Sequence, residues 1–304
     1  MKNILYIENT KKSCNYYIDT IIFLRKYANI KICKDPFVSS IENKNFNADL
    51  IIIGYDITDC GENRPNIKFK NDLNLPLFII LNKEYAGLKK KLEWIKELNP
   101  KICFSVQHEV EKYEEMTRIP FKRIMWSADH NIFKKYDDIY KYDLLFQGVI
   151  RKEQTNDLRN KIYNKLISLK FPRIELNVSF YNNGKLSKKL YELSNEEYAR
   201  KMNHAKICFS TTGPADLVSP RFFEIMAGNK SMILCNRMDE KVYEDMLIDK
   251  FNCIMYEDEN DFIEKFVYYI SNEGERLKIV LNAYKYFMEK LTWDVQIKKM
   301  LNYL

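Results

Sequence analysis

The sequence predicts an α/β fold built from two Rossmann-like domains in tandem. Short apolar runs recur along the chain, each followed by a segment with helical periodicity, and these units form two successive series. The runs are continuous instead of alternating, as in parallel strands covered on both faces. At 304 residues the chain also exceeds the usual size of one core, so two domains of about 150 residues each are expected.

The first series predicts an N-terminal domain over residues 1–127. Its expected strands are 3–8, 29–33, 50–55, 76–82, 101–106 and 122–127, and its expected helices include 16–28 and 85–98. The polar stretch 128–141 lacks a clear period and is interpreted as a linker.

The second series predicts a C-terminal domain over residues 142–304. Its expected strands are 142–148, 173–180, 205–210, 230–235 and 251–256, and its expected helices are 158–169, 195–205, 220–227, 261–272 and 275–291. The acidic run Glu257–Asp261 is interpreted as a helix-start cluster.

Composition excludes several classes of protein. The chain is 46% hydrophobic with 8 Gly and 8 Pro, which excludes disordered and collagenous chains. The net charge of +7 comes from scattered basic residues, which suits an anionic ligand, leaves a peripheral membrane contact open and disfavours nucleic-acid binding. Seven cysteines without a CxxC pair are read as buried thiols in a reducing compartment, and no apolar stretch reaches the ~18 residues of a membrane span. A cytoplasmic location is expected.

The stretch SPRFFEIMAGNKSMIL, residues 219–234, contains a helix start, a helix stop and a strand. Ser219 suits an N-cap and Pro220 the first helical position, while Gly228 is the predicted stop. Arg221 and Glu224 lie three residues apart near the helix start, where free N–H groups favour a phosphate. A glutamate there also has a simpler reading, as an acid that favours the positive helix end.

The pattern RFFEIMAGNKSMIL resembles the nucleotide-sugar signature of group 1 (family 4-like) glycosyltransferases of GT-B fold, closest to the spore-maturation-protein-like branch. YDLLFQGVIRK, WSADHNIF and the acidic turn with its following helices resemble the same family. The resemblance implies two Rossmann-like domains facing each other across a cleft, with a C-terminal helix packing back on the first domain.

The resemblance also implies site residues. The nucleotide sugar would contact Ser219, Phe222 and Glu224, and Glu224 would hold the ribose. The diphosphate would lie near Gly148, Arg151 and Arg221. Lys152 is a basic neighbour of Arg151. The family often has a second lysine a few residues later, which this sequence lacks at the usual spacing, and Arg159 or Arg221 could substitute for it. Asp216, eight positions before Glu224, stands where the family has a glutamate near the transferred sugar.

Polar residues that follow strands of the first domain predict the acceptor side, because ligands bind at the carboxyl ends of parallel strands. His108 matches a family histidine that reaches the donor sugar, against the simpler reading of a surface histidine. Glu84 could act as a general base if the enzyme inverts, with a helix-start carboxylate as the alternative. His130 and His204 are read as structural. The loop IENTKKSC lacks the glycines that many GT-B enzymes have after the first strand.

The implied activity is transfer of a sugar from a nucleotide diphosphate sugar to an acceptor hydroxyl on a glycan or glycoconjugate, with retention and without a metal or other cofactor. No D-x-D or His/Cys cluster suggests a metal site. Three alternatives stay open: a catalytically silent GT-B-like binding protein, a nucleotide-sugar epimerase, and a DNA-modifying glycosyltransferase.

Overall fold

The computed structural model describes residues 1–8, 15–33, 46–67, 71, 74–151, 157–182, 185–186 and 193–304. The loop IENTKKSC after the first strand, apart from its first residues, and Lys152 lie outside these residues. By their contacts, the residues form two compact units. One comprises Met1–Trp126, Pro214–Leu217 and Trp293–Leu304, and the other comprises Ser127–Gly213 and Val218–Thr292.

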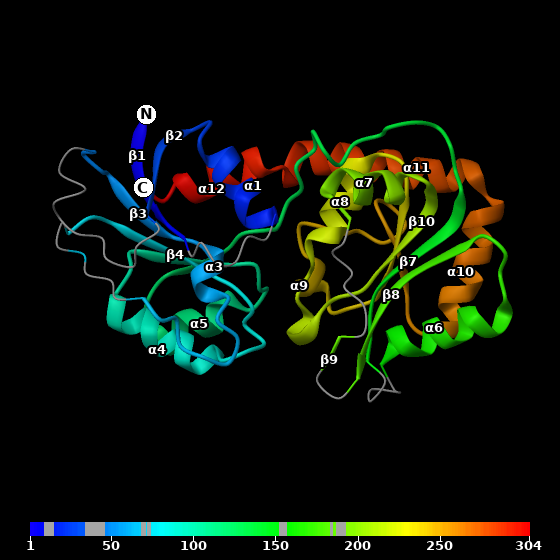
Figure 1. Cartoon of the computed structure of the whole chain (residues 1–304), viewed down its shortest axis with the longest axis horizontal. Helices are drawn as coiled ribbons and strands as arrows, with labels where there is room; N and C mark the ends of the chain where they lie inside the picture. The colour runs from blue at the N-terminus through cyan, green and yellow to red at the C-terminus, as the bar shows by residue number, and fades with distance from the viewer. Residues whose placement is uncertain are drawn as a thin grey trace. The chain divides into compact units, whose positions relative to one another are not determined.

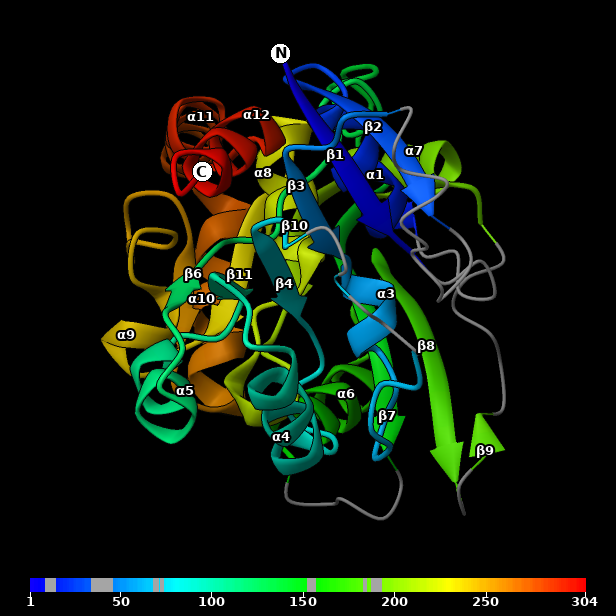
Figure 2. The same ribbon diagram turned by 90° about the vertical axis from the view of Figure 1, so that its left-hand side faces the viewer.

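The N-terminal unit is built on a parallel six-stranded sheet with the order β2-β1-β3-β4-β5-β6. Figure 2 shows β1, β3 and β4 running in the same direction. The strands are β1 Lys2–Ile7, β2 Ala28–Cys33, β3 Leu50–Ile53, β4 Leu77–Leu81, β5 Ile102–Ser105 and β6 Phe121–Arg123. The helices are α1 Asn15–Leu24, α3 Tyr55–Thr58, α4 Leu88–Leu98, α5 Val110–Thr117 and α12 Trp293–Leu301.

The core of this unit explains why the strands read as continuous apolar runs. Every residue of β3 and β4 is buried, because helices or loops cover both faces of the central strands. The C-terminal helix α12 belongs to this unit: Tyr27 donates a hydrogen bond of 2.5 Å to Asp294, and the Met125 N–H donates to Gln296 at 3.0 Å.

The C-terminal unit carries a second six-stranded sheet, with the order β12-β11-β10-β7-β8-β9. Figure 1 labels β10, β7, β8 and β9 of this sheet. Among the strand pairs of this sheet that lie in the described residues, β8 and β9 are antiparallel and the others are parallel. The strands are β7 Tyr142–Arg151, β8 Ile174–Asn182, β9 Lys185–Leu186, β10 Ala205–Ser210, β11 Met232–Asn236 and β12 Ile254–Tyr256. The helices are α6 Leu158–Leu169, α7 Asn195–Asn203, α8 Pro220–Gly228, α9 Glu240–Tyr243, α10 Glu259–Ser271 and α11 Glu273–Tyr286, with the short helix η2 Phe287–Leu291. The short helix η1 Pro214–Asp216 lies between β10 and α8 in sequence but belongs to the N-terminal unit.

Strand β7 is longer than its neighbour β10. It pairs with β8 as far as Arg151, but with β10 only as far as Leu145. The chain order also reverses here, because β8 follows β7 on one side while β10, β11 and β12 continue on the other. Ligands of open α/β sheets bind at the carboxyl ends of strands at such a reversal. The topology therefore directs attention to the loops after β7 and β10.

Two Rossmann-like parallel sheets confirm the predicted fold class, and several local predictions need correction. The helix stop after α8 is Asn229, which adopts a left-handed φ of 47°, instead of Gly228, which is the last helical residue. The strand expected at 122–127 is shorter and earlier, at Phe121–Arg123. Ser219 occupies the N-cap of α8, but its hydroxyl makes no capping hydrogen bond.

Other predictions agree with the structure. Asp258 caps α10 by accepting from the N–H groups of Asn260 and Asp261, so the acidic run is a helix start. His204 is the C-cap of α7, consistent with a structural role. The described cysteines are free thiols, with Cys103, Cys208, Cys235 and Cys253 buried and Cys33 and Cys60 partly exposed. In the described part of the chain, no helix combines the length and apolarity needed to cross a bilayer.

Candidate functional site

Two arginines converge at the carboxyl end of β7. Arg159, in the first turn of α6, donates to the Val149 carbonyl at 3.3 Å. Arg221, in the first turn of α8, donates to the Gln147 carbonyl at 3.0 Å. The two carbonyls are two residues apart on a strand, so they face the same side. Both guanidinium groups therefore bind the segment of β7 that extends beyond β10.

Further hydrogen bonds hold the two arginines. Arg159 donates from Nε to the Thr211 hydroxyl at 3.0 Å, and from a terminal nitrogen to the same oxygen. Arg221 donates from Nε to the Tyr198 hydroxyl at 3.2 Å. Burial lowers the pKa of Arg159, and the nearby positive charge of Arg221 lowers it further. Two like charges held together in this way favour the binding of an anion between or beside them.

Gly148 lies between the two carbonyls and against Arg159. Its φ is 159°, which residues with a side chain rarely adopt, and a Cβ placed there would meet the Arg159 side chain at 3.4 Å. The glycine thus allows the backbone path of β7, while a Cβ there would make ordinary van der Waals contact with Arg159. The sequence resemblance predicted that Gly148 lies near the diphosphate, and in the structure its neighbour is the Arg159 side chain.

We expect Gly148→Ala to lower the free energy of unfolding by about 1–3 kcal/mol, the usual cost of a disfavoured backbone conformation. Urea denaturation measures the change. Gly274→Ala is the matched control, because Gly274 lies in the first turn of α11 and a Cβ placed there would meet no atom within 4 Å, so alanine should stabilise by about 0.5–1 kcal/mol. Equal effects of the two substitutions would contradict the conformational argument.

Glu224 follows Arg221 along α8 and is 8% exposed. Its negative charge, after burial, raises the pKa of the Tyr198 hydroxyl, which places the carboxylate in the same group as Tyr198 and Arg221. A carboxylate accepts hydrogen bonds only, so it suits the two neighbouring hydroxyls of a ribose. Phe222, also predicted to contact the nucleotide sugar, is fully buried and packs against Tyr243 with ring centroids 6.0 Å apart.

The segment after β10 is fixed by β11. Asn236 accepts from the Thr212 N–H at 3.1 Å and donates to the Thr212 hydroxyl at 3.2 Å, and Tyr243 donates to the Asn236 side chain at 3.2 Å. Thr211, which holds Arg159, is therefore followed by an anchored residue. Sequence reasoning missed Thr211 and Asn236, because their role depends on which strands are neighbours.

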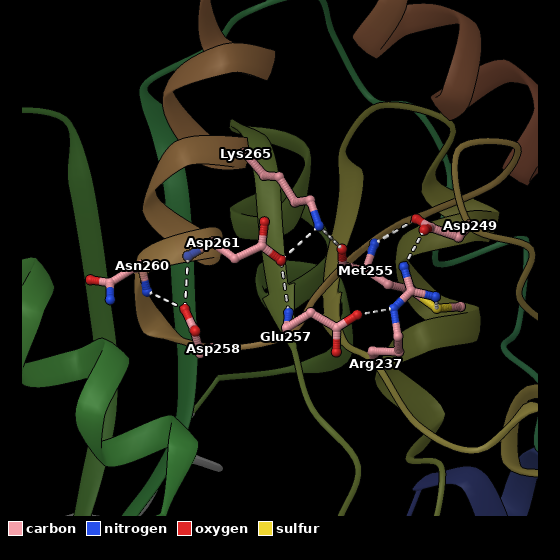
Figure 3. A network of polar contacts seen from close by, with 8 residues as sticks. All are labelled: Arg237, Asp249, Met255, Glu257, Asp258, Asn260, Asp261 and Lys265. Atoms are coloured by element: carbon pink, nitrogen blue, oxygen red, sulfur yellow. Dashed lines mark hydrogen bonds and ion pairs between the residues drawn. The ribbon is translucent and has the colours of Figure 1, made fainter.

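A network of ion pairs fixes the loops after β11 and β12 (Figure 3). Arg237 pairs with Asp249 and with Glu257, both at 2.5 Å, and Lys265 pairs with Asp261 at 2.7 Å. These charges neutralise one another, so the network is a support for this edge of the sheet and offers less net charge to an anion than Arg159 and Arg221 do.

Arg151, predicted near the diphosphate, is exposed at the end of β7. Its guanidinium lies 5.6 Å from the centre of the Tyr181 ring on β8. Asp216 is exposed and adopts a left-handed φ of 56°, as does its neighbour Ala215 at 55°. By its contacts, this turn belongs to the N-terminal unit.

The N-terminal unit brings the other predicted residues together. Glu84 follows β4 and accepts a hydrogen bond from the Ser105 hydroxyl at the end of β5. Gln107 donates to the Ala215 carbonyl at 2.7 Å and accepts from the His108 N–H at 2.8 Å. His108 is half-buried between β5 and α5. Glu84, His108 and the turn of Asp216 are thus linked to one polar group at the carboxyl ends of β4 and β5.

Comparison with known proteins identifies a family for part of the chain and the fold of the whole. Residues 154–302 match the protein family described as "Glycosyl transferase-like". HepE from Anabaena, solved in complex with UDP and glucose, matches with a TM-score of 0.60 at 10% identity over 100% of both chains. Sucrose-phosphate synthase from Thermosynechococcus elongatus matches with a TM-score of 0.60 at 9% identity, over 99% of this chain and 98% of that one. A glycosyltransferase from Rickettsia africae matches with a TM-score of 0.59 at 10% identity, over 99% and 97% of the two chains. No curated protein sequence matches the chain.

The structural matches show the GT-B fold, in which two Rossmann-like domains follow one another. The C-terminal half adds a glycosyl transferase-like domain that contains Arg159, Arg221 and Glu224. Together they show a chain of GT-B fold whose residues 154–302 match a glycosyl transferase-like family.

Proposed function

We propose that the protein transfers a sugar from a nucleotide diphosphate sugar to an acceptor hydroxyl of a glycan or glycoconjugate. The observation that carries the proposal is the pair Arg159 and Arg221, anchored on β7 at the reversal point of the C-terminal sheet. The leaving diphosphate gains negative charge as the sugar bond breaks. Fixed cationic donors stabilise that charge without reorganising, which is the largest contribution in many enzymes.

The donor proposed for the first test is a UDP-sugar, because HepE, which shares the fold, was solved with UDP and with UDP-glucose. In this assignment Arg159 and Arg221 bind the diphosphate, and Glu224 binds the ribose. Retention of configuration, independence from metal and membership of the spore-maturation-protein-like branch are parts of the proposal that rest on the sequence resemblance. A cytoplasmic location is a part that rests on the cysteine pattern and on the sequence lacking an apolar stretch of membrane-spanning length. Among the described residues, no group of three or more His, Cys, Asp or Glu side chains is placed to hold a metal ion.

The experiment is a release assay for the nucleoside diphosphate with UDP-, GDP-, TDP- and CDP-sugars, each with and without a panel of glycan acceptors. We expect acceptor-dependent release from one donor class that persists in EDTA, and an NMR spectrum of the product with the anomeric configuration of the donor. Tight nucleotide binding with no release would support the silent binding protein instead. Activity lost in EDTA and restored by a divalent metal would contradict metal independence.

We expect Glu224→Gln to weaken UDP binding by about tenfold, or about 1.4 kcal/mol, because an amide replaces an ionised acceptor of ribose hydrogen bonds. Isothermal titration calorimetry with UDP and with 2′,3′-dideoxy-UDP isolates the ribose contribution. The wild-type protein should prefer UDP, and the variant should lose most of that preference. An unchanged preference in the variant would exclude Glu224 as the ribose ligand.

A further inference from the structure

A buried carboxyl group at the end of β4 has one oxygen without a protein partner among the described residues. The Glu84 side chain is 4% exposed, and its Oε1 accepts a hydrogen bond from the Ser105 hydroxyl. Its Oε2 is buried and has no hydrogen-bond partner among the residues that the structure describes. Burying such an oxygen costs free energy, so a role that uses it would explain why it is kept.

Ser105 is oriented so that its single proton is directed to Glu84. It is fully buried, and its oxygen accepts a hydrogen bond from the Gln107 N–H at 2.9 Å. This accepted bond restricts the orientation of the hydroxyl group, whose single proton is donated to Glu84 Oε1. The serine thereby fixes one carboxylate oxygen and leaves the other as the available acceptor.

The groups that face Glu84 come from four elements. After burial, the negative charge of Glu84 raises the pKa of Tyr55 at the start of α3 and of Tyr113 on α5. Ser105 lies at the end of β5, and Lys91 on α4 contributes a positive charge. Burial raises the pKa of Glu84 to about 6, while the Ser105 hydrogen bond, the Glu84 backbone N–H and Lys91 lower it. Glu84 is therefore mainly ionised at neutral pH, as a hydrogen-bond acceptor must be.

We propose that Ser105 is a positioning residue that orients Glu84 so that Oε2 accepts the hydrogen bond of the acceptor hydroxyl during sugar transfer. This inference rests on the proposed function. It assigns the carboxyl ends of β4 and β5 to recognition of a neutral hydroxyl, since an anionic acceptor group would be repelled by the carboxylate. In a retaining transfer Glu84 orients the hydroxyl and need not take its proton.

The test compares Ser105→Ala with Thr58→Val. Thr58 is also fully buried in this unit, and its hydroxyl donates to the Ile80 carbonyl at 2.9 Å, so its loss removes a buried hydroxyl without touching Glu84. In Ser105→Ala we expect the acceptor KM to rise at least about fivefold, the usual effect of one lost hydrogen bond, with the donor KM unchanged. The acid limb of the profile of kcat/KM against pH should also move to higher pH, because the lost hydrogen bond had lowered the pKa of Glu84. Thr58→Val should move neither quantity.

A measurement without turnover separates the inference from the proposed function. The free energy of unfolding is measured against pH for the wild type, Ser105→Ala and Glu84→Gln. The pH-dependent step that is present in the wild type and absent in Glu84→Gln belongs to Glu84. This step should move to higher pH in Ser105→Ala. An unmoved titration would overturn the coupling of Ser105 to Glu84. A moved titration with unchanged acceptor KM and pH profile would overturn the acceptor role and leave the transferase function intact. Absence of transfer by the wild-type protein with every donor would overturn both.

Discussion

Replacing Arg159 by methionine is expected to weaken UDP binding by about ten- to a hundredfold, which corresponds to the loss of about 1.5–3 kcal/mol for hydrogen bonds to a charged group. Arg159 is held by Thr211 and by the Val149 carbonyl, so its charge is fixed before a ligand arrives. A fixed donor loses little side-chain entropy on binding, which is why its removal should have a large effect. Calorimetry at two salt concentrations measures the change.

Arg151→Met is the matched control, since it removes one positive charge from the same unit. Arg151 is exposed at the end of β7, with its guanidinium 5.6 Å from the centre of the Tyr181 ring, so solvent screens its charge. We expect it to weaken UDP binding by less than about threefold at physiological salt. A larger loss in Arg151→Met than in Arg159→Met would show that the diphosphate lies nearer the end of β7, as the sequence resemblance implied. Urea denaturation of both variants excludes loss of the fold as the cause.

Replacing Glu84 by glutamine is expected to lower transfer activity. It should also make the free energy of unfolding, relative to that of the wild type, more favourable at high pH than at low pH. Burial raises the pKa of Glu84 from its ordinary 4.5 to about 6, so the folded protein binds this proton more tightly than the unfolded chain does. The stability from Glu84 is then fully present below about pH 4.5 and is lost as the pH rises through about 6. A difference of about 1.5 pKa units corresponds to about 2 kcal/mol.

The measurement is the free energy of unfolding in urea between about pH 4 and pH 8. The difference between Glu84→Gln and wild type should change by about 2 kcal/mol in favour of the variant over this range, whatever the packing cost of the amide. Glu115→Gln on the exposed face of α5 is the control and should show no such change. A pH-independent difference for Glu84→Gln would mean that Glu84 titrates alike in the folded and unfolded chain.

The order of strands and helices, and the helix start at Ser219 and Pro220, could be predicted from the sequence, because hydrophobic periodicity and capping residues act locally. The position of Arg159 over Gly148 could not, since that contact depends on α6 folding back against the extended end of β7. Sequence reasoning could only name Arg159 as a substitute for a missing lysine. Ser105 gave no signal, because a serine at the end of an apolar strand looks like any buried small residue until Glu84 is placed beside it.

The helix stop after α8 shows the same limit on a smaller scale. Glycine is the usual residue at a left-handed helix end, so Gly228 was the natural choice, but asparagine also tolerates that conformation and Asn229 adopts it. The two candidates are adjacent, and local propensity alone does not decide between them. In the structure Gly228 stays helical and lies against the side chain of Asn203 on α7.

The unequal lengths of β7 and β10 have a consequence for how this site can change. Both arginines bind carbonyl oxygens of the backbone, at Gln147 and Val149, and neither of these two bonds depends on the side chain there. Amino-acid identity at those two positions can therefore drift during evolution while the anchors persist. An insertion or deletion of one residue in the same segment would instead turn the carbonyls to the opposite side and release both arginines together. Chain length, more than composition, is what this part of the strand must conserve.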